Sequence, residues 1–319
     1  MKRTLCFLLT LVMLFGLLAG CGGETNKSEN TEDTSRANAY FKEDPADDGV
    51  LQVLLIGNSF CHYFTDELYE MLAAEGKPVE VTSVYYSGCR LEQYWTWLGD
   101  KSPNFQFTTR STRGTEEVKD LTLEDGLQKA NWDIITLQQH YAPSITVSKE
   151  EVDKSIEPYM GNLMNFYTEK FPDAQIMWHQ TWAYEVGYTK VANEPDNPSN
   201  VLTVERQKQC HDLIRQSSLE ICEKYKLPRI PCGDAWAAAR EHTLFGDTLC
   251  RSIGKNDHYH DGNVGGGQLL NAYCFFEMIT GKSPVGNTYR PNYAPQISEE
   301  KFAALQQIAH DAVTAAKAG

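Results

Sequence analysis

Short, mostly apolar runs alternate with longer amphipathic stretches through the chain after residue 50. Runs of this length, rich in Val, Ile and Leu, are typical of strands that are buried on both faces of a sheet. The predicted strands are Leu51–Ile56, Val79–Tyr85, Asp133–Gln138, Ala174–Trp178 and Arg229–Cys232. Because helical stretches separate them, these strands favour an α/β fold with a mostly parallel five-stranded sheet covered on both faces.

The stretches between the strands carry apolar residues at helical spacing. In the clearest case Cys210, Ile214 and Ile221 fall on one stripe, and Thr203 is placed to cap the N-terminus. The predicted helices are Thr65–Glu75, Leu123–Lys129, Lys149–Lys170, Thr203–Lys224, Gly265–Ile279 and Ser298–Ala316.

Two segments interrupt this alternation. Lys101–Glu117 is polar, with Phe105 and Phe107 at alternating positions, and it predicts a hairpin insertion. Tyr184–Asn200 contains Asn-Glu-Pro-Asp-Asn-Pro and is too long for a structureless connection, which favours a binding loop.

The first residues have the pattern of an export signal. A basic start, Met1-Lys2-Arg3, precedes an apolar run from Leu5 to Leu18 and the sequence Leu18-Ala19-Gly20-Cys21. The run is shorter than the ~20 residues that span a bilayer, which argues against a transmembrane helix. Small residues before a cysteine are typical of a bacterial lipobox, so we expect Cys21 to be lipidated; the alternative is an ordinary cleaved signal peptide.

The segment after Cys21 is acidic and nearly devoid of apolar residues. Residues 22–49 hold eight acidic and three basic side chains, a composition that cannot bury enough surface to fold. We therefore predict a lipoprotein signal peptide at 1–20, a flexible tether at 21–49 and a single globular domain at 50–319.

Charge and cysteine content exclude several classes of function. The formal net charge of −14 argues against nucleic acid as a partner, because such proteins need clustered basic surface. No Cys or His cluster has zinc-ligand spacing, so we expect neither a metal nor another cofactor. Most of the nine cysteines are expected to be buried hydrophobic residues. A disulfide between Cys61 and Cys89 is one alternative.

Two fragments at opposite ends of the domain carry the chemistry. Ser59 follows the first predicted strand in a Gly-Asn-Ser turn, and Asp257 stands three residues before His260. Taken alone, a serine at a strand end is more often a helix cap than a nucleophile. Together, in this order, the residues would supply nucleophile, base and orienting carboxylate, which favours catalysis.

These residues resemble the blocks of the SGNH (GDSL-like) hydrolases, in an uncharacterised bacterial branch of secreted and lipid-anchored members. The first block matches Gly57-Asn58-Ser59-Phe60, the second matches Gly88 after the second strand, and the last matches Asp257, His260 and Gly265. The resemblance covers the chain from Val50 to about Gly286. It implies a flavodoxin-like three-layer α/β/α sandwich.

One block departs from the pattern of that family. After the third strand the superfamily usually has Gly-x-Asn-Asp, whose asparagine amide donates a hydrogen bond to the oxyanion. This chain has Leu137-Gln138-Gln139-His140-Tyr141 instead. The resemblance implies oxyanion donors at the Ser59 N–H, at the Gly88 N–H and at the amide of Gln138 or Gln139, with the glutamine left open.

The same resemblance assigns Ser59 as nucleophile, His260 as general base and Asp257 as its orienting partner, with His258 as a neighbour. Weaker candidates for contact with substrate are Trp178, His179 and Arg90. The leading hypothesis is a cell-surface serine esterase that removes acetyl or other short acyl groups, expected on carbohydrate. An acyltransferase with the same triad and a non-catalytic glycan-binding lipoprotein are the alternatives. As partners we expect an acylated small molecule or glycan and a membrane through the lipid at Cys21, with the protein itself a monomer.

Overall fold

The computed structural model of the chain describes residues 49–188, 201–245, 266–292 and 297–318. Several sequence predictions fall on other residues, namely the signal peptide, most of the tether, Cys21, Asp257, His258 and His260, and they lie outside the described residues. Among the described residues no helix combines the length and the apolar character needed to cross a membrane.

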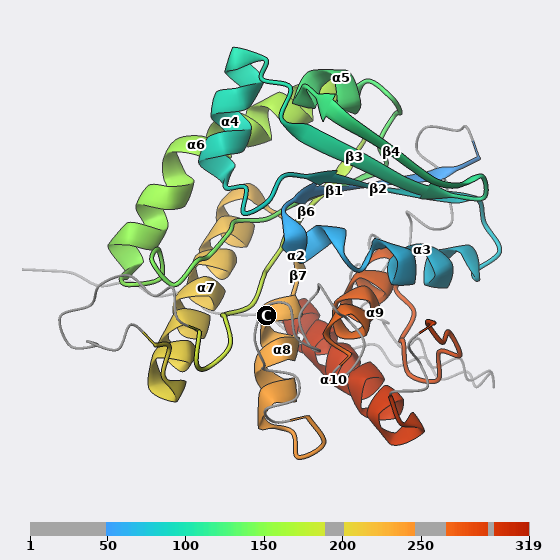
Figure 1. Cartoon of the computed structure of the whole chain (residues 1–319), viewed down its shortest axis with the longest axis vertical. Helices are drawn as coiled ribbons and strands as arrows, with labels where there is room; N and C mark the ends of the chain where they lie inside the picture. The colour runs from blue at the N-terminus through green and yellow to red at the C-terminus, as the bar shows by residue number, and fades with distance from the viewer. Residues whose placement is uncertain (1–48, 189–200, 246–265, 293–296, 319) are drawn as a thin grey trace, which may run out of the picture. The chain divides into compact units, whose positions relative to one another are not determined.

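A central sheet of seven strands, in the order β4-β3-β2-β1-β5-β6-β7, organises the described chain (Figure 1). The predicted number of five strands was therefore wrong. Five strands do pair in parallel, in the order β2-β1-β5-β6-β7, as a flavodoxin-like fold requires. These strands are β1 (Leu51–Gly57), β2 (Val79–Tyr85), β5 (Ile134–Leu137), β6 (Gln175–His179) and β7 (Arg229–Ile230).

The two additional strands are the predicted hairpin, β3 (Phe105–Ser111) and β4 (Gly114–Leu121). They were expected as an insertion, but β3 pairs antiparallel with β2 and so extends the sheet. The burial of its aromatic side chains explains why β3 can join the central sheet. Phe105 and Phe107 are 0% and 1% exposed and enter the core, whereas almost every residue of β4 faces solvent.

The predicted helices are present with shifts of a few residues at their ends. They are α3 (Thr65–Ala73), α5 (Leu123–Leu127), α6 (Lys149–Lys170), α7 (Val204–Tyr225), α9 (Gly267–Thr280) and α10 (Glu299–Ala318). Within the described ranges, three further helices were not predicted: α2 (Ser59–His62), α4 (Leu91–Asp100) and α8 (Cys232–Glu241). The strand predicted to reach Cys232 stops at Ile230 because Pro231 has no N–H for the ladder and precedes α8 directly.

Helices cover both faces of the sheet (Figure 1). On one face α4, α6 and α7 pack against one another in turn, and on the other α3, α9, α10 and α8 do so. Every residue of α9 is buried, as expected of a helix enclosed by other elements on all sides. Because β1 is buried along its whole length, the turn that follows it is held firmly at the carboxyl edge of the sheet.

Candidate active site

The turn after β1 places Ser59 at the carboxyl edge of the sheet, where α/β folds bind their ligands. Asn58 caps α2, since its Oδ1 accepts a hydrogen bond from the Phe60 N–H at 2.9 Å. Ser59 is therefore not the cap. It is the first residue of the helix and 7% exposed, and no described residue hydrogen-bonds to its hydroxyl. The side chain that the turn needs for its own stability is Asn58, which leaves the Ser59 hydroxyl available for chemistry.

A second turn, after β2, is tied to the first by Asn58. Gly88 has a φ of +64°, a left-handed conformation that favours glycine, and it precedes the first turn of α4. The Asn58 Nδ2 donates to the Cys89 carbonyl oxygen at 3.1 Å. Ser59 follows Asn58 in sequence and Gly88 precedes Cys89, so this one buried hydrogen bond brings the two predicted site residues together.

Gln138, at the end of β5, connects a third turn to the same asparagine. Its Nε2 donates to the Asn58 Oδ1 at 2.9 Å, and its Oε1 accepts from the His179 Nδ1 at 3.1 Å. The side chain is 2% exposed and packs against Gly57, where a Cβ would approach Gln138 Cδ to 2.4 Å. A residue other than glycine at position 57 would displace Gln138 and with it the Asn58 cap.

Gln139 is fully buried and has a different set of partners. Its Oε1 accepts from the backbone N–H of Leu91 at 3.2 Å and of His140 at 2.9 Å. Its Nε2 donates to the Ser155 carbonyl oxygen at 2.7 Å, so this amide links the N-terminus of α4 to α6. Both glutamines proposed from sequence as oxyanion donors are hydrogen-bonded inside the described structure.

His140 stands beside Gly88 and was not singled out from the sequence. Its Nε2 lies 2.8 Å from the Tyr184 hydroxyl, and its ring centroid lies 5.9 Å from that of Phe60, the residue after Ser59. Burial, and then the positive charge of Arg90, lower the pKa of His140 to about 4, against a smaller raising effect of the Gly88 backbone. The imidazole is therefore neutral at physiological pH. Its position directly after Gln-Gln at a strand end was the signal available in the sequence.

The remaining weak candidates differ in their positions. Trp178 and His179 are both 0% exposed, and the Trp178 Nε1 donates to the Ser218 Oγ at 3.0 Å, so both side chains belong to the packed core. Arg90 occupies the N-cap position of α4 without a side-chain capping bond and is partly exposed, and it is close enough to His140 for its charge to lower the pKa of the imidazole. Of the three, only Arg90 lies near the Ser59 and Gly88 turns with part of its side chain accessible.

The buried His179 predicts a pH dependence of stability. Burial lowers the pKa of His179 to about 3, whereas an unfolded histidine titrates near 6.5. The unfolded state therefore binds more protons between these values, and the free energy of unfolding falls as the pH drops through that window. From pH 7 to pH 5 the loss from this residue is about 2 kcal/mol.

His179→Gln keeps an N–H for the Gln138 oxygen but does not titrate. We expect urea unfolding to show that the stability advantage of the wild type over this variant shrinks by about 2 kcal/mol between pH 7 and pH 5. An advantage that stays constant over this range would mean that His179 is not buried in its neutral form.

Neither of the cysteines beside the two candidate turns, Cys61 and Cys89, is a competing nucleophile. Cys61 and Cys89 are both free, so the disulfide considered between them is absent. Burial raises the pKa of both thiols, which keeps them protonated and unreactive. Within the described ranges there is also no group of three or more His, Cys, Asp or Glu side chains placed to hold a metal ion.

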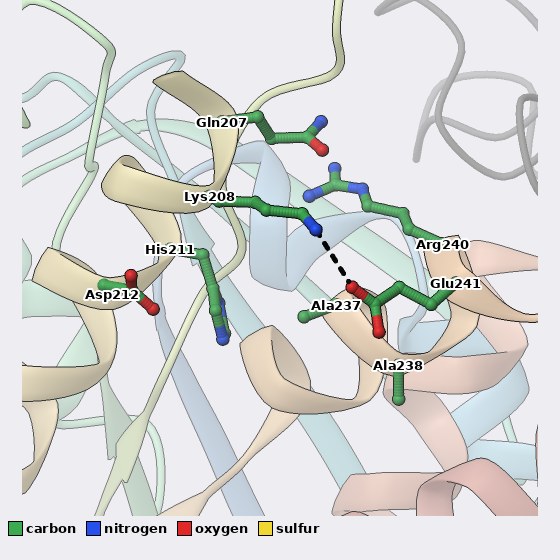
Figure 2. Close-up of a pocket in the computed structure, with 8 residues that line it drawn as sticks. All are labelled: Gln207, Lys208, His211, Asp212, Ala237, Ala238, Arg240 and Glu241. Atoms are coloured by element: carbon green, nitrogen blue, oxygen red, sulfur yellow. Dashed lines mark ion pairs between the residues drawn. The ribbon is translucent and has the colours of Figure 1, made fainter. Parts of the chain in front are cut away.

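A pocket of about 330 Å³ lies elsewhere, between α7 and α8 (Figure 2). Its lining includes Lys208 and Asp212 from α7 and Arg240 and Glu241 from α8. Lys208 Nζ and Glu241 Oε1 point toward one another at 3.4 Å, as Figure 2 shows. None of the predicted site residues lines this pocket, and the charges of opposite sign across it do not select a ligand class.

Comparison with known proteins gives the family. The family model described as "Domain of unknown function (DUF4886)" matches residues 52–312. The chain belongs to the DUF4886 family. The match includes the Ser59, Gly88 and Gln138 turns and extends through α9 into α10. No curated protein matches the sequence of this DUF4886 chain.

Several solved structures resemble this DUF4886 domain. A DUF4886 family protein from Bacteroides uniformis is 24% identical, with a TM-score of 0.65 and coverage of 83% of this chain and 95% of that one. A GDSL-like lipase from Parabacteroides merdae, described as putative, is 14% identical with a TM-score of 0.47, covering 73% and 96%. An acetyl-xylooligosaccharide esterase from Geobacillus is 13% identical with a TM-score of 0.43, covering 72% and 94%. At 24% identity, the likeness to the Bacteroides uniformis structure supports the fold alone.

Proposed function

We propose that the protein is a serine esterase that hydrolyses acetyl or other short acyl esters, with Ser59 as the nucleophile. The observation that carries this proposal is the state of Ser59. Its hydroxyl lies at the carboxyl edge of the sheet, while the cap that this turn requires is made by Asn58. A serine freed from a structural role at a ligand-binding edge is placed to attack a carbonyl carbon.

The proposed reaction has two acyl-transfer steps. In the first, the Ser59 oxygen bonds to the ester carbonyl carbon while His260 takes the hydroxyl proton, and collapse of the tetrahedral intermediate expels the alcohol, which receives that proton. In the second, water attacks the acyl-serine in the same way and releases the carboxylic acid and free Ser59. Asp257 is proposed to hold the His260 ring in the required tautomer.

Negative charge develops on the carbonyl oxygen in both steps. We propose the backbone N–H groups of Ser59 and Gly88 as donors to it. The Ser59 N–H is the first amide of α2, and no carbonyl oxygen within the helix precedes it to accept its hydrogen bond. Donors held in place before the reaction stabilise the oxyanion without any cost of rearrangement, each by ~3 kcal/mol in enzymes where this was measured.

The proposed substrate and location are supported by features of the chain outside the candidate site. A lipid at Cys21 followed by an acidic tether would hold the domain at the cell surface, where acylated carbohydrate is an available ester. The net charge of −14 favours a neutral ester over an anionic polymer. We therefore propose acetylated or otherwise acylated carbohydrate as the substrate class.

A serine-directed fluorophosphonate probe, applied to intact bacteria that express the chain, tests the nucleophile and the location together. We expect labelled wild-type protein in the membrane fraction, no label on Ser59→Ala, and loss of Cys21→Ser from that fraction or retention of its uncleaved signal. Label on Ser59→Ala would reject the nucleophile, and a mature Cys21→Ser protein still bound to membranes would reject the lipid anchor. Acetate release from a panel of acetylated polysaccharides then identifies the substrate.

A further inference from the structure

The side chain that would act as third oxyanion donor is still to be identified, because both glutamine amides already donate to other groups. The Gln138 Nε2 donates to the Asn58 Oδ1, and the Gln139 Nε2 donates to the Ser155 carbonyl oxygen. Withdrawing either amide toward a substrate would break a bond that positions the turns themselves. A side chain whose N–H does not hold the turns in place is better suited to donate to the oxyanion.

His140 is such a side chain, and it lies against Gly88. A Cβ built on Gly88 would be 3.6 Å from His140 Cε1 and 3.8 Å from its Nδ1, so ring and glycine are in van der Waals contact. The Nδ1 atom is buried and makes no hydrogen bond of good geometry within the part of the chain that the structure describes, although the Gly88 backbone is near enough to raise the pKa of the ring slightly. A buried polar atom without a hydrogen bond costs free energy. A ligand oxygen that accepted a hydrogen bond from Nδ1 would remove that cost and so bind more favourably.

Tyr184 can set the tautomer that donation requires. The His140 Nε2 lies 2.8 Å from the Tyr184 hydroxyl, and when the phenol donates its proton to Nε2 the neutral ring carries its own proton on Nδ1. Because burial and Arg90 lower the pKa of His140 to about 4, the ring stays neutral at physiological pH. A neutral imidazole can polarise a carbonyl oxygen without giving up its proton.

We propose that His140, through its Nδ1–H, is the side-chain donor to the oxyanion, beside the backbone N–H groups of Ser59 and Gly88. This assignment rests on the proposed esterase function. It replaces the glutamine expected from sequence with the residue that follows it. Tyr184 is then a positioning residue, which acts by holding the imidazole in its donating form.

The test compares two variants of nearly equal side-chain size, His140→Leu and His140→Asn, with p-nitrophenyl acetate as the substrate. Leucine has no donor, so we expect kcat to fall roughly 10²- to 10³-fold with KM within about threefold of the wild-type value. Asparagine restores an N–H, so we expect its kcat to exceed that of the leucine variant at least tenfold. His211→Ala is the matched control, because His211 is another partly buried histidine whose pKa burial lowers, and it lies on α7.

Thermal unfolding of each variant separates catalysis from folding. If His140→Leu does not fold, His140→Ala takes its place in the comparison. An active wild type, an inactive Ser59→Ala and a His140→Leu variant with kcat within threefold of wild type would overturn the donor assignment alone, as would equal kcat values for the leucine and asparagine variants. An inactive wild type, or a fully active Ser59→Ala, would overturn the esterase function and this assignment together.

Discussion

Ser59→Ala is expected to lower kcat/KM for p-nitrophenyl acetate by several orders of magnitude while the protein remains folded. The magnitude follows from the chemistry, because removing the nucleophile of a serine hydrolase leaves only the oxyanion donors and substrate binding, at a cost of about 10⁶ in a well-studied case. The fold should tolerate the change. The Ser59 hydroxyl has no bond to any described residue, and Asn58, which caps the turn, is retained.

Ser87→Ala is the matched control for this measurement. Ser87 is exposed and lies next to Gly88, so its loss removes a hydroxyl from the same region without touching the proposed nucleophile. We expect its rate to stay within about threefold of wild type, as surface substitutions usually change little. Retention of more than about a tenth of wild-type kcat/KM by Ser59→Ala would reject the proposed mechanism, given the usual scale of such deletions.

His260→Ala is expected to match Ser59→Ala in severity, with the double variant little worse, because residues that act as a unit are not additive. One imidazole stands between serine and carboxylate in this mechanism. A histidine three residues after Asp257 can turn its ring back to that carboxylate, whereas His258, next to the aspartate, would have to fold back sharply. We therefore expect His258→Ala to retain most of its activity.

Steady-state kinetics of both histidine variants on one ester make the comparison. Asp257→Asn should be less damaging than His260→Ala, since the base remains but is misoriented. An inactive His258→Ala together with an active His260→Ala would overturn the assignment of Asp257 and His260. The role of Ser59 would still be tested separately by Ser59→Ala.

The parallel core of the fold could be predicted because its signals are local. Each parallel strand is a short apolar run, and Lys149–Lys170 has a serine cap and acidic first turn that define its start. The seven-stranded sheet could not be predicted from such signals. Nothing in the periodicity of β3 reveals that it pairs with β2, since antiparallel pairing at a sheet edge depends on which edge is left uncovered. Helices α4 and α8 are ten residues each, short enough for turn residues to obscure their period.

In the candidate site, too, some features could be predicted from the sequence and others needed the fold. The positions of Ser59 and Gly88 follow from strand ends, which sequence patterns locate well, and the structure joins their turns through Asn58. The bonding of Gln138 and Gln139 does not follow, because it depends on which side chains three separate turns present to one another. The pairing of His140 with Tyr184 joins residues 44 positions apart, and it needs the fold before it can be recognised.

The outermost strands determine how this sheet meets other molecules. A free strand edge is a template for adding another chain, yet β4 has almost all its residues in water and carries Glu116, Glu117 and Lys119, and a bulge interrupts its pairing with β3. At the opposite edge β7 has only two residues, which pair with β6 and leave too short an edge for a further strand to pair with. With one edge charged and irregular and the other only two residues long, the sheet discourages the addition of a strand from another molecule, which lowers the risk of aggregation while the chain folds.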